Sequence, residues 1–192
     1  MSVNSRQPEN PVDDLFLNRW SPRAMSGEPI SKTDLMTLFE AAKWAPSSSN
    51  AQPWRFVYAL RDTPAFQKFF DTQVEFNRMW TKNASALILV ASKKTNDKGE
   101  PAPTHAFDAG AAWMSLALQA SMKGLVAHGM AGFDYDKARQ AAAFPDDYAV
   151  QAMIAVGKPG KKEDLPPMLQ KRESPSQRRI LSGSVFEAEF HS

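Results

Sequence analysis

Apolar residues recur along this chain at two different spacings, and each spacing predicts a different kind of element. Residues 31–45 carry them at the three- and four-residue steps of an amphipathic helix. Ser31 and Asp34 form a start that resembles a capping box, and Pro46 ends the helix. The apolar residues of its buried face are Leu35, Leu38, Phe39 and Ala42.

Three further helices follow from the same spacing. The first covers residues 64–82, with Pro64 in its first turn. Its expected buried face consists of Phe66, Phe69, Phe70 and Val74. The second covers residues 105–123, is rich in small residues and ends at Gly124. The third lies within residues 132–144, with Asp134 as its N-cap.

Shorter apolar runs, some of them alternating, predict strands. They are "RFVYAL" at 55–60, "SALILVAS" at 85–92, "LVAHGMA" at 125–131 and "YAVQAMIAVG" at 148–157. Strands interleaved with helices give an α/β-type pattern, which leaves the strand order open. The polar N-terminus predicts a disordered arm over residues 1–14, and residues 15–192 are expected to form a single domain.

Composition narrows the class of protein. Hydrophobic residues make up 43 % and charged residues 23 %, as in ordinary globular domains. The formal net charge is only +2, which predicts neither nucleic-acid nor membrane binding. The absence of cysteine excludes disulfides and thiolate metal sites, and no histidine spacing suggests a metal. No apolar run approaches the roughly 20 residues of a membrane span, so we expect a cytoplasmic protein.

Two polar stretches remain as candidate binding elements. "WAPSSSNAQPWRF", residues 44–56, places short donors and acceptors between two tryptophans, a mixture that suits a planar ligand with polar edges. The same stretch is also compatible with a helix-terminating loop whose serines cap the backbone and whose tryptophans belong to the core. In "NRWSPRAM", Arg19, Ser21 and Arg23 alternate, so an extended backbone would point all three toward one anion such as a phosphate.

Taken together, several motifs resemble the FMN-dependent nitroreductase family. They are "RWSPRAM", "AAKWAPSSSNAQPWRF", "FNRMW", "HGMAGFD" and "RESPSQRRILSGSVFE", in this order from about Arg19 to Phe186. The resemblance implies an α+β fold, with a mixed, mostly antiparallel sheet sandwiched by helices. It also implies a homodimer that exchanges C-terminal arms, which would bury the phenylalanines of "SVFEAEF".

The resemblance also implies a non-covalent FMN site. The arm 19–23 and the arginines at 178–179 match phosphate contacts, and the arm also matches a ring-edge contact. The loop 46–52 matches the family's segment that lies against the flavin. Asn77 matches a residue that contacts the rim of the ring, and residues 131–132 match the backbone beside the ring. The implied FMN-binding residues are Arg19, Ser21, Arg23, Pro46, Ser47, Ser48, Asn50, Gln52, Asn77, Ala131, Gly132, Arg178 and Arg179.

The implied chemistry belongs to the flavin, and no catalytic side chain is expected. NAD(P)H would deliver hydride to flavin N5, and a nitroaromatic, quinone or enone would then accept it in a ping-pong cycle. The alternative is a flavin-binding storage or regulatory protein without NAD(P)H turnover. Ser49, Gly129 and Ile180 depart from the family pattern, and the first two are expected to widen the pocket over the flavin.

Overall fold

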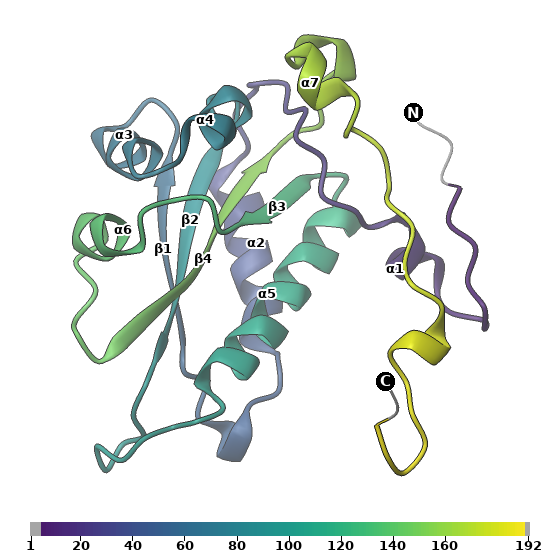
Figure 1. Cartoon of the computed structure of the whole chain (residues 1–192). Helices are drawn as coiled ribbons and strands as arrows, with labels where there is room; N and C mark the ends of the chain where they lie inside the picture. The colour runs from purple at the N-terminus through teal and green to yellow at the C-terminus, as the bar shows by residue number, and fades with distance from the viewer. Residues whose placement is uncertain (1–4, 191–192) are drawn as a thin grey trace.

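The computed structural model describes residues 5–190, and within them the chain builds one antiparallel sheet covered by helices on both faces (Figure 1). The strands are β1 Trp54–Leu60, β2 Ala86–Lys93, β3 Val126–Met130 and β4 Tyr148–Gly157. The helices are α1 Asp14–Asn18, α2 Lys32–Lys43, α3 Pro64–Asp71, α4 Glu75–Thr81, α5 His105–Met122, α6 Tyr135–Ala141 and α7 Pro167–Gln170. Short 3₁₀ turns lie at Ser48–Asn50, Lys162–Asp164 and Leu181–Gly183.

The sheet order is β1-β2-β4-β3, and every neighbouring pair is antiparallel. The fold is therefore α+β, as the family resemblance implied, and the simple α/β reading is wrong. Strands β2 and β4 are central. Nearly all of β2 and the second half of β4 are buried, which explains the continuous apolar runs there. The four predicted strands are confirmed to within one residue at each end.

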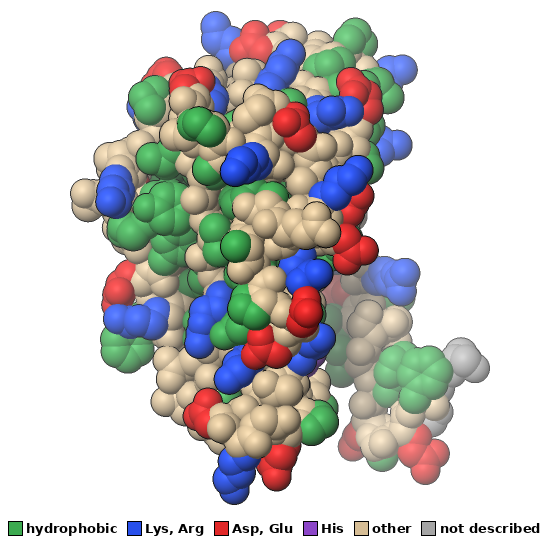
Figure 2. Space-filling view, turned by 90° about the vertical axis from the view of Figure 1, so that its left-hand side faces the viewer, with side chains coloured by type: hydrophobic (Ala, Val, Ile, Leu, Met, Phe, Trp, Pro, Cys, Tyr) green, Lys and Arg blue, Asp and Glu red, His purple; other side chains and the backbone are tan. Residues whose placement is uncertain are grey.

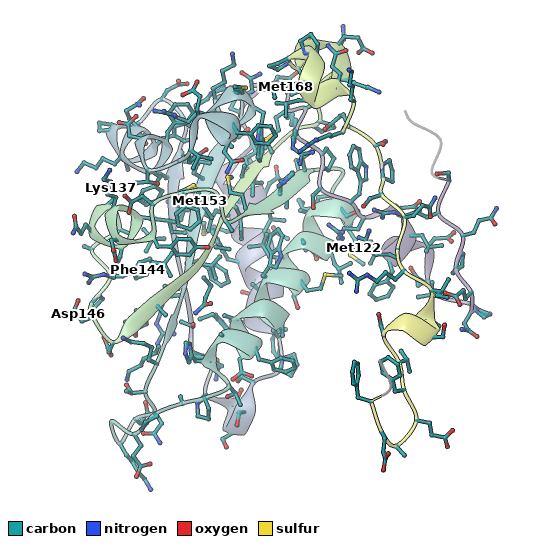
Figure 3. The ribbon with its side chains drawn as sticks, in the orientation of Figure 1. Met122, Lys137, Phe144, Asp146, Met153 and Met168 are labelled. Carbon is teal, nitrogen blue, oxygen red and sulfur yellow. The ribbon has the colours of Figure 1, made fainter. Side chains whose placement is uncertain are left out.

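Successive residues of the central strands enter two different cores. On β2, Leu87, Leu89 and Ala91 face one core, whereas Ala86, Ile88 and Val90 face the other. Helices α3, α4 and α6 cover the first face, and α2 and α5 cover the second (Figure 1). Figure 3 shows Met153 of β4 on the first face and Met122 at α5, on the opposite side of the sheet.

Local sequence signals set most helix starts. The Ser31 hydroxyl accepts from the backbone N–H of Asp34 at 2.9 Å, and Asp134 accepts from that of Lys137 at 3.0 Å. Pro64 occupies the first turn of α3, as predicted. Helix α5 ends at Met122, and Gly124 beyond it adopts a φ of 66°, where glycine is favoured.

The prediction of one helix over residues 64–82 is wrong, because the chain breaks it into α3 and α4. Gln73, at the break, forms an isolated β-bridge with Phe133, and the Val74 N–H donates to the Gly132 carbonyl at 3.0 Å. The N–H groups of Thr72 and Gln73 still bond to carbonyls of α3, whereas the N–H of Val74 and the carbonyl of Thr72 bond to the distant segment. Val74 is consequently 48 % exposed instead of lying in the predicted buried face.

Residues 5–9 and 176–181 lie side by side next to α1 (Figure 1). The Gln177 side chain donates to the Ser5 carbonyl at 3.2 Å, and the Leu181 N–H donates to Glu9 Oε1 at 2.8 Å. The predicted arm over 1–14 includes residues 1–4, which lie outside the described residues. Its disorder and the single-domain division stay predictions.

The C-terminal arm, residues 174–190, projects from the body of the molecule (Figure 2). Its apolar side chains are mostly exposed: Val185 by 65 % and Phe190 by 77 %. Phe186 is half-buried and packs edge-on against Phe190, with ring centroids 4.9 Å apart, and neither belongs to the two cores found within residues 5–190. In the same residues, no helix is both long and apolar enough to span a bilayer.

Candidate functional site

Of the residues that the structure describes, five arginines line one cavity of about 270 Å³. It lies where the segment after α1 meets β3 and the C-terminal arm. No carboxylate is among its described lining residues. These are Arg6, Arg19, Trp20, Ser21, Arg23, His128, Arg172, Ser174, Ser176 and Arg178. We call this space the arginine cavity.

The arm at residues 19–23 reaches the arginine cavity in extended form. Arg19 caps the C-terminal end of α1 with an extended backbone, and its Nη1 donates to the Ser21 hydroxyl at 3.3 Å. Glu173, after α7, fixes the far end of the arm. Its Oε1 accepts from the backbone N–H groups of Arg23 and Ala24, at 2.8 Å each. The alternating side chains thus converge on one space, as the sequence predicted.

Like charges meet in the arginine cavity. Burial lowers the pKa of Arg19 below its ordinary value, and the nearby Arg178 lowers it further. Burial likewise lowers the pKa of Arg6, with smaller contributions from Arg178 and Arg19. Arg23 Nε is buried and has no hydrogen-bond partner within residues 5–190. Repelling cations and an unused buried donor are what an anion would satisfy.

His128 of β3 closes one wall of the arginine cavity as a neutral ring. Its Nδ1 lies 3.0 Å from the Pro22 carbonyl, to which it donates, and its ring packs 4.6 Å from that of Trp80. Burial lowers the pKa of His128 to about 4, the hydrogen bond to Pro22 opposes this shift, and Arg23 adds to it. His128 therefore helps to hold the arm without adding a sixth cation.

His128 predicts an acid-sensitive stability. Its pKa is about 4 in the folded chain and ordinarily 6.5, so between these values the unfolded chain binds more protons. This contribution to the free energy of unfolding is fully present above about pH 6.5 and is lost toward pH 4, with a total of about 3 kcal/mol. Denaturant unfolding at several pH values should show this slope. His128→Asn should flatten the dependence of the unfolding free energy on pH. The control His105→Asn should keep this dependence, because His128 is still present. Equal slopes in wild type and both variants would contradict the assignment of the slope to His128.

Asn77 and Gly132 form a second predicted group, at the end of β3. Asn77 is buried, and its Nδ2 donates to the Gly132 carbonyl at 2.9 Å. A Cβ at position 132 would lie 2.6 Å from that Nδ2, so only glycine permits the approach. Ala131, next to them, is exposed. The structure thus joins Asn77 and Gly132, with the amide of Asn77 directed at backbone.

The serine-rich loop, residues 46–52, has a strained backbone. Ser49, Asn50 and Gln52 have φ values of 50°, 54° and 46°, in the region that non-glycine residues seldom adopt. The Ser47 hydroxyl accepts from the Gln52 N–H at 3.0 Å. The buried Asp108 of α5 accepts from the Ser48 N–H at 3.3 Å. Surrounding contacts thus hold the loop in a conformation that its own residues disfavour.

Two tryptophans flank this loop, and they have different roles. Trp54 lies in the core with 7 % exposure, whereas Trp44 is 77 % exposed. The interpretation of residues 44–56 as a site for a planar ligand therefore does not extend to the Trp54 side chain within one chain. The alternative, in which a serine caps the loop and a tryptophan belongs to the core, holds for Ser47 and Trp54.

Within one chain, the serine-rich loop does not reach the arginine cavity. None of residues 46–52 lines that cavity. Figure 1 shows the loop below the start of α5, whereas α1 and both arms lie beside the middle of that helix. Arg178 belongs to the arginine cavity, while Arg179 lines a neighbouring space between the two arms. The predicted residues thus form three separate groups in a single chain, and Arg179 lies outside all three.

Sequence reasoning missed several residues of the site. Arg6 lies in the arm predicted to be disordered, and a lone arginine there carries no pattern. His128 and Asp108 are polar positions on otherwise apolar elements, a signal that could have marked them. Glu173 precedes "SPSQRR" and could have been read as a partner for that basic segment, although it bonds to backbone N–H groups.

Gly129 does not widen a pocket. A Cβ at this position would lie 3.0 Å from the Trp113 ring of α5, so the space beside Gly129 is filled by that ring. The expectation that this departure from the family pattern opens the site is wrong. Ser49 is exposed at the tip of the serine-rich loop, and Ile180 is 64 % exposed on the C-terminal arm.

The sequence model of the Nitroreductase family matches residues 17–72 and 59–158. Because these ranges cover more than half of the chain, this protein belongs to the Nitroreductase family. Among the curated proteins, Protein DrgA of Synechocystis is 32 % identical over 179 residues, which span 78 % of this chain and 81 % of that protein.

Two solved structures extend the comparison. One, described as an oxidoreductase containing FMN, is 47 % identical with a TM-score of 0.94, covering 100 % of this chain and 98 % of the other. Another, provisionally described as a nitroreductase, comes from Desulfovibrio desulfuricans and is in complex with FMN. It is 25 % identical with a TM-score of 0.74, covering 96 % of this chain and 100 % of the other. One match is more local: the chain spans 45 % of a Rhodopseudomonas palustris protein provisionally named NADH dehydrogenase/NAD(P)H nitroreductase, at 27 % identity over 89 residues.

Proposed function

We propose that this protein is an FMN-dependent oxidoreductase that uses NAD(P)H to reduce an electron-poor small molecule. The observation that carries the proposal is the arginine cavity, where five guanidinium groups and no described carboxylate surround about 270 Å³. Such a site fits a phosphate monoester, which presents a double negative charge and several acceptor oxygens. The similarity to two FMN-containing structures supports FMN as the bearer of that phosphate.

The residues present fit this cofactor. Arg23 has a buried donor without a partner, and Ser21 can add a hydroxyl. Arg19 and Arg178 repel each other without an anion, so a phosphate between them would relieve that repulsion. We infer that these four side chains hold the phosphate. Asn77, Ala131 and Gly132 would then lie beside the ring.

The complete site requires a second copy of the chain in this proposal. The serine-rich loop and the arginine cavity are separate in one chain, so a single ring can contact both only between two protomers. Helix α5 also presents three exposed apolar side chains along one face: Phe107, Met114 and Met122. Together with the exposed C-terminal arm, they supply apolar surface for a homodimer.

When bound, FMN supplies the redox chemistry, taking a hydride from NAD(P)H and passing it to a nitroaromatic, quinone or enone. The protein contributes binding, orientation and charge. In the alternative assignment, Arg19 or Arg23 contacts the ring edge instead of the phosphate, and its donors would there stabilise negative charge on the reduced flavin. The strained serine-rich loop, held by Asp108, would present its free hydroxyls and the Asn50 amide to the ring in a fixed orientation.

The flavin itself gives the first test. Purified protein should be yellow, and the released cofactor should have the mass of FMN, at one per chain. Under anaerobic conditions NADH or NADPH should bleach it, and a nitroaromatic or quinone should restore the colour. Bound FMN that neither nucleotide reduces would instead support a flavin-binding protein without turnover. A colourless protein that does not bind added FMN would contradict both.

A further inference from the structure

The N-terminal arm, residues 5–12, places one guanidinium between the two chain segments that carry phosphate-binding arginines. Arg6 Nε donates to the Ser176 carbonyl at 2.9 Å. Its Nη1 donates to the carbonyls of Leu17 and Arg19, each also at 2.9 Å. Arg6 therefore contacts the backbone of Arg19 itself and the backbone two residues before Arg178.

These contacts satisfy groups that α1 leaves open. The last carbonyls of a helix have no intrahelical partner, and an arginine can bind them when it approaches the C-terminal end. The Leu17 and Arg19 carbonyls lie at that end of α1. With Ser176 added, one planar fork ties the start of the arginine arm to the C-terminal arm.

The rest of the N-terminal arm strengthens the connection. Gln177 donates to the Ser5 carbonyl, and the Leu181 N–H donates to the carboxylate of Glu9. The arm thus follows the C-terminal segment from residue 176 to 181. Residues 5–12 lie before the part of the chain that matches the family model, which begins at residue 17.

We propose that Arg6 is a positioning residue for cofactor binding, which holds Arg19 and Arg178 at the spacing that one phosphate requires. This inference rests on the proposed function. Arg6 acts through the backbone of the two segments, because three of its donor contacts go to carbonyl oxygens. Two consequences follow for cofactor affinity. The contribution of Arg6 to this affinity depends on the forked geometry of the guanidinium more than on its charge. It acts on binding of the phosphate more than on binding of the flavin ring.

FMN and riboflavin, which lacks the phosphate, make these consequences measurable. Dissociation constants for both should be measured by flavin fluorescence with wild type, Arg6→Ala and Arg6→Lys. Arg6→Ala should bind FMN about tenfold more weakly, because Arg19 and Arg178 would no longer be held at the spacing that the phosphate requires, which costs on the order of one hydrogen bond to a charged group. Its affinity for riboflavin should stay within about twofold of wild type. Arg6→Lys keeps the charge but cannot span three carbonyls, so it should resemble Arg6→Ala.

The control is Arg139→Ala, which removes another arginine that donates to a backbone carbonyl, that of Phe144, away from the arginine cavity. It should leave both affinities unchanged. Arg6→Ala with wild-type FMN affinity would overturn the role, and so would an equal loss for FMN and riboflavin. Full recovery in Arg6→Lys would overturn the bridging geometry. Wild type that binds no FMN would instead contradict the proposed function on which this role depends.

Discussion

Arg19→Ala is expected to weaken FMN binding by roughly 10- to 100-fold while leaving the apo protein as stable as wild type. The affinity loss follows from removing a charge-assisted donor from the phosphate, worth about 1.5–3 kcal/mol. The stability of the apo form should not fall, because Arg19 is held against the like charges of Arg178 and Arg6. Its removal relieves that repulsion and takes away only one hydrogen bond, to Ser21.

The two quantities should be measured on the same protein samples. FMN titration gives the dissociation constant, and thermal unfolding with and without FMN gives the apo melting temperature and the shift on binding. Arg139→Ala serves as the control, since that arginine does not line the arginine cavity. Equal losses of apo stability and FMN affinity in Arg19→Ala would show that Arg19 is structural only.

Glu173→Ala should have the largest effect on stability, lowering the free energy of unfolding by about 2–3 kcal/mol. The Glu173 side chain is 5 % exposed and accepts from two backbone N–H groups, those of Arg23 and Ala24. Alanine would leave both donors buried without an acceptor, which is costly. The arginine arm would also lose its anchor, so FMN affinity should fall together with stability.

Two further variants separate the causes of that effect. Glu173→Gln keeps one acceptor oxygen and removes the negative charge of the carboxylate. The second carboxylate oxygen, Oε2, has no partner within residues 5–190, so its replacement breaks no described hydrogen bond. This variant should therefore lose less than about 1 kcal/mol. Glu163 is an exposed glutamate that lines the same surface hollow as Glu173, so Glu163→Ala is the control and should leave the urea midpoint unchanged. If Glu173→Ala also leaves that midpoint unchanged, the anchoring role is wrong.

The periodicity of apolar residues was sufficient to predict most elements of the fold. The four strands and helices α2, α5 and α6 follow from local patterns and caps, because their side chains meet the core at regular spacing. Helix α3 could not be bounded in this way. Its C-terminal end depends on Gln73 and Val74 bonding to residues 132 and 133, which are distant in sequence. Helix α1 also gives no signal, since none of its residues is buried.

The site was predictable only in part, for the same reason. Arg19, Ser21, Arg23 and Arg178 come together as the motifs indicated. Arg6 joins them because residues 5–9 contact residues 176–181, and no local sequence pattern encodes a contact between segments so far apart in the chain. The serine-rich loop lies elsewhere in a single chain, so its relation to the arginines requires a partner that one sequence does not describe.

A crystal structure of the protein with FMN tests the central claim most directly. We expect the phosphate within hydrogen-bond distance of Arg19 and Arg178 of one protomer, and the ring against the serine-rich loop of the other. Contradiction would come from FMN bound elsewhere, from a ring that meets only its own chain's loop, or from a cavity that stays closed while its arginines face bulk solvent.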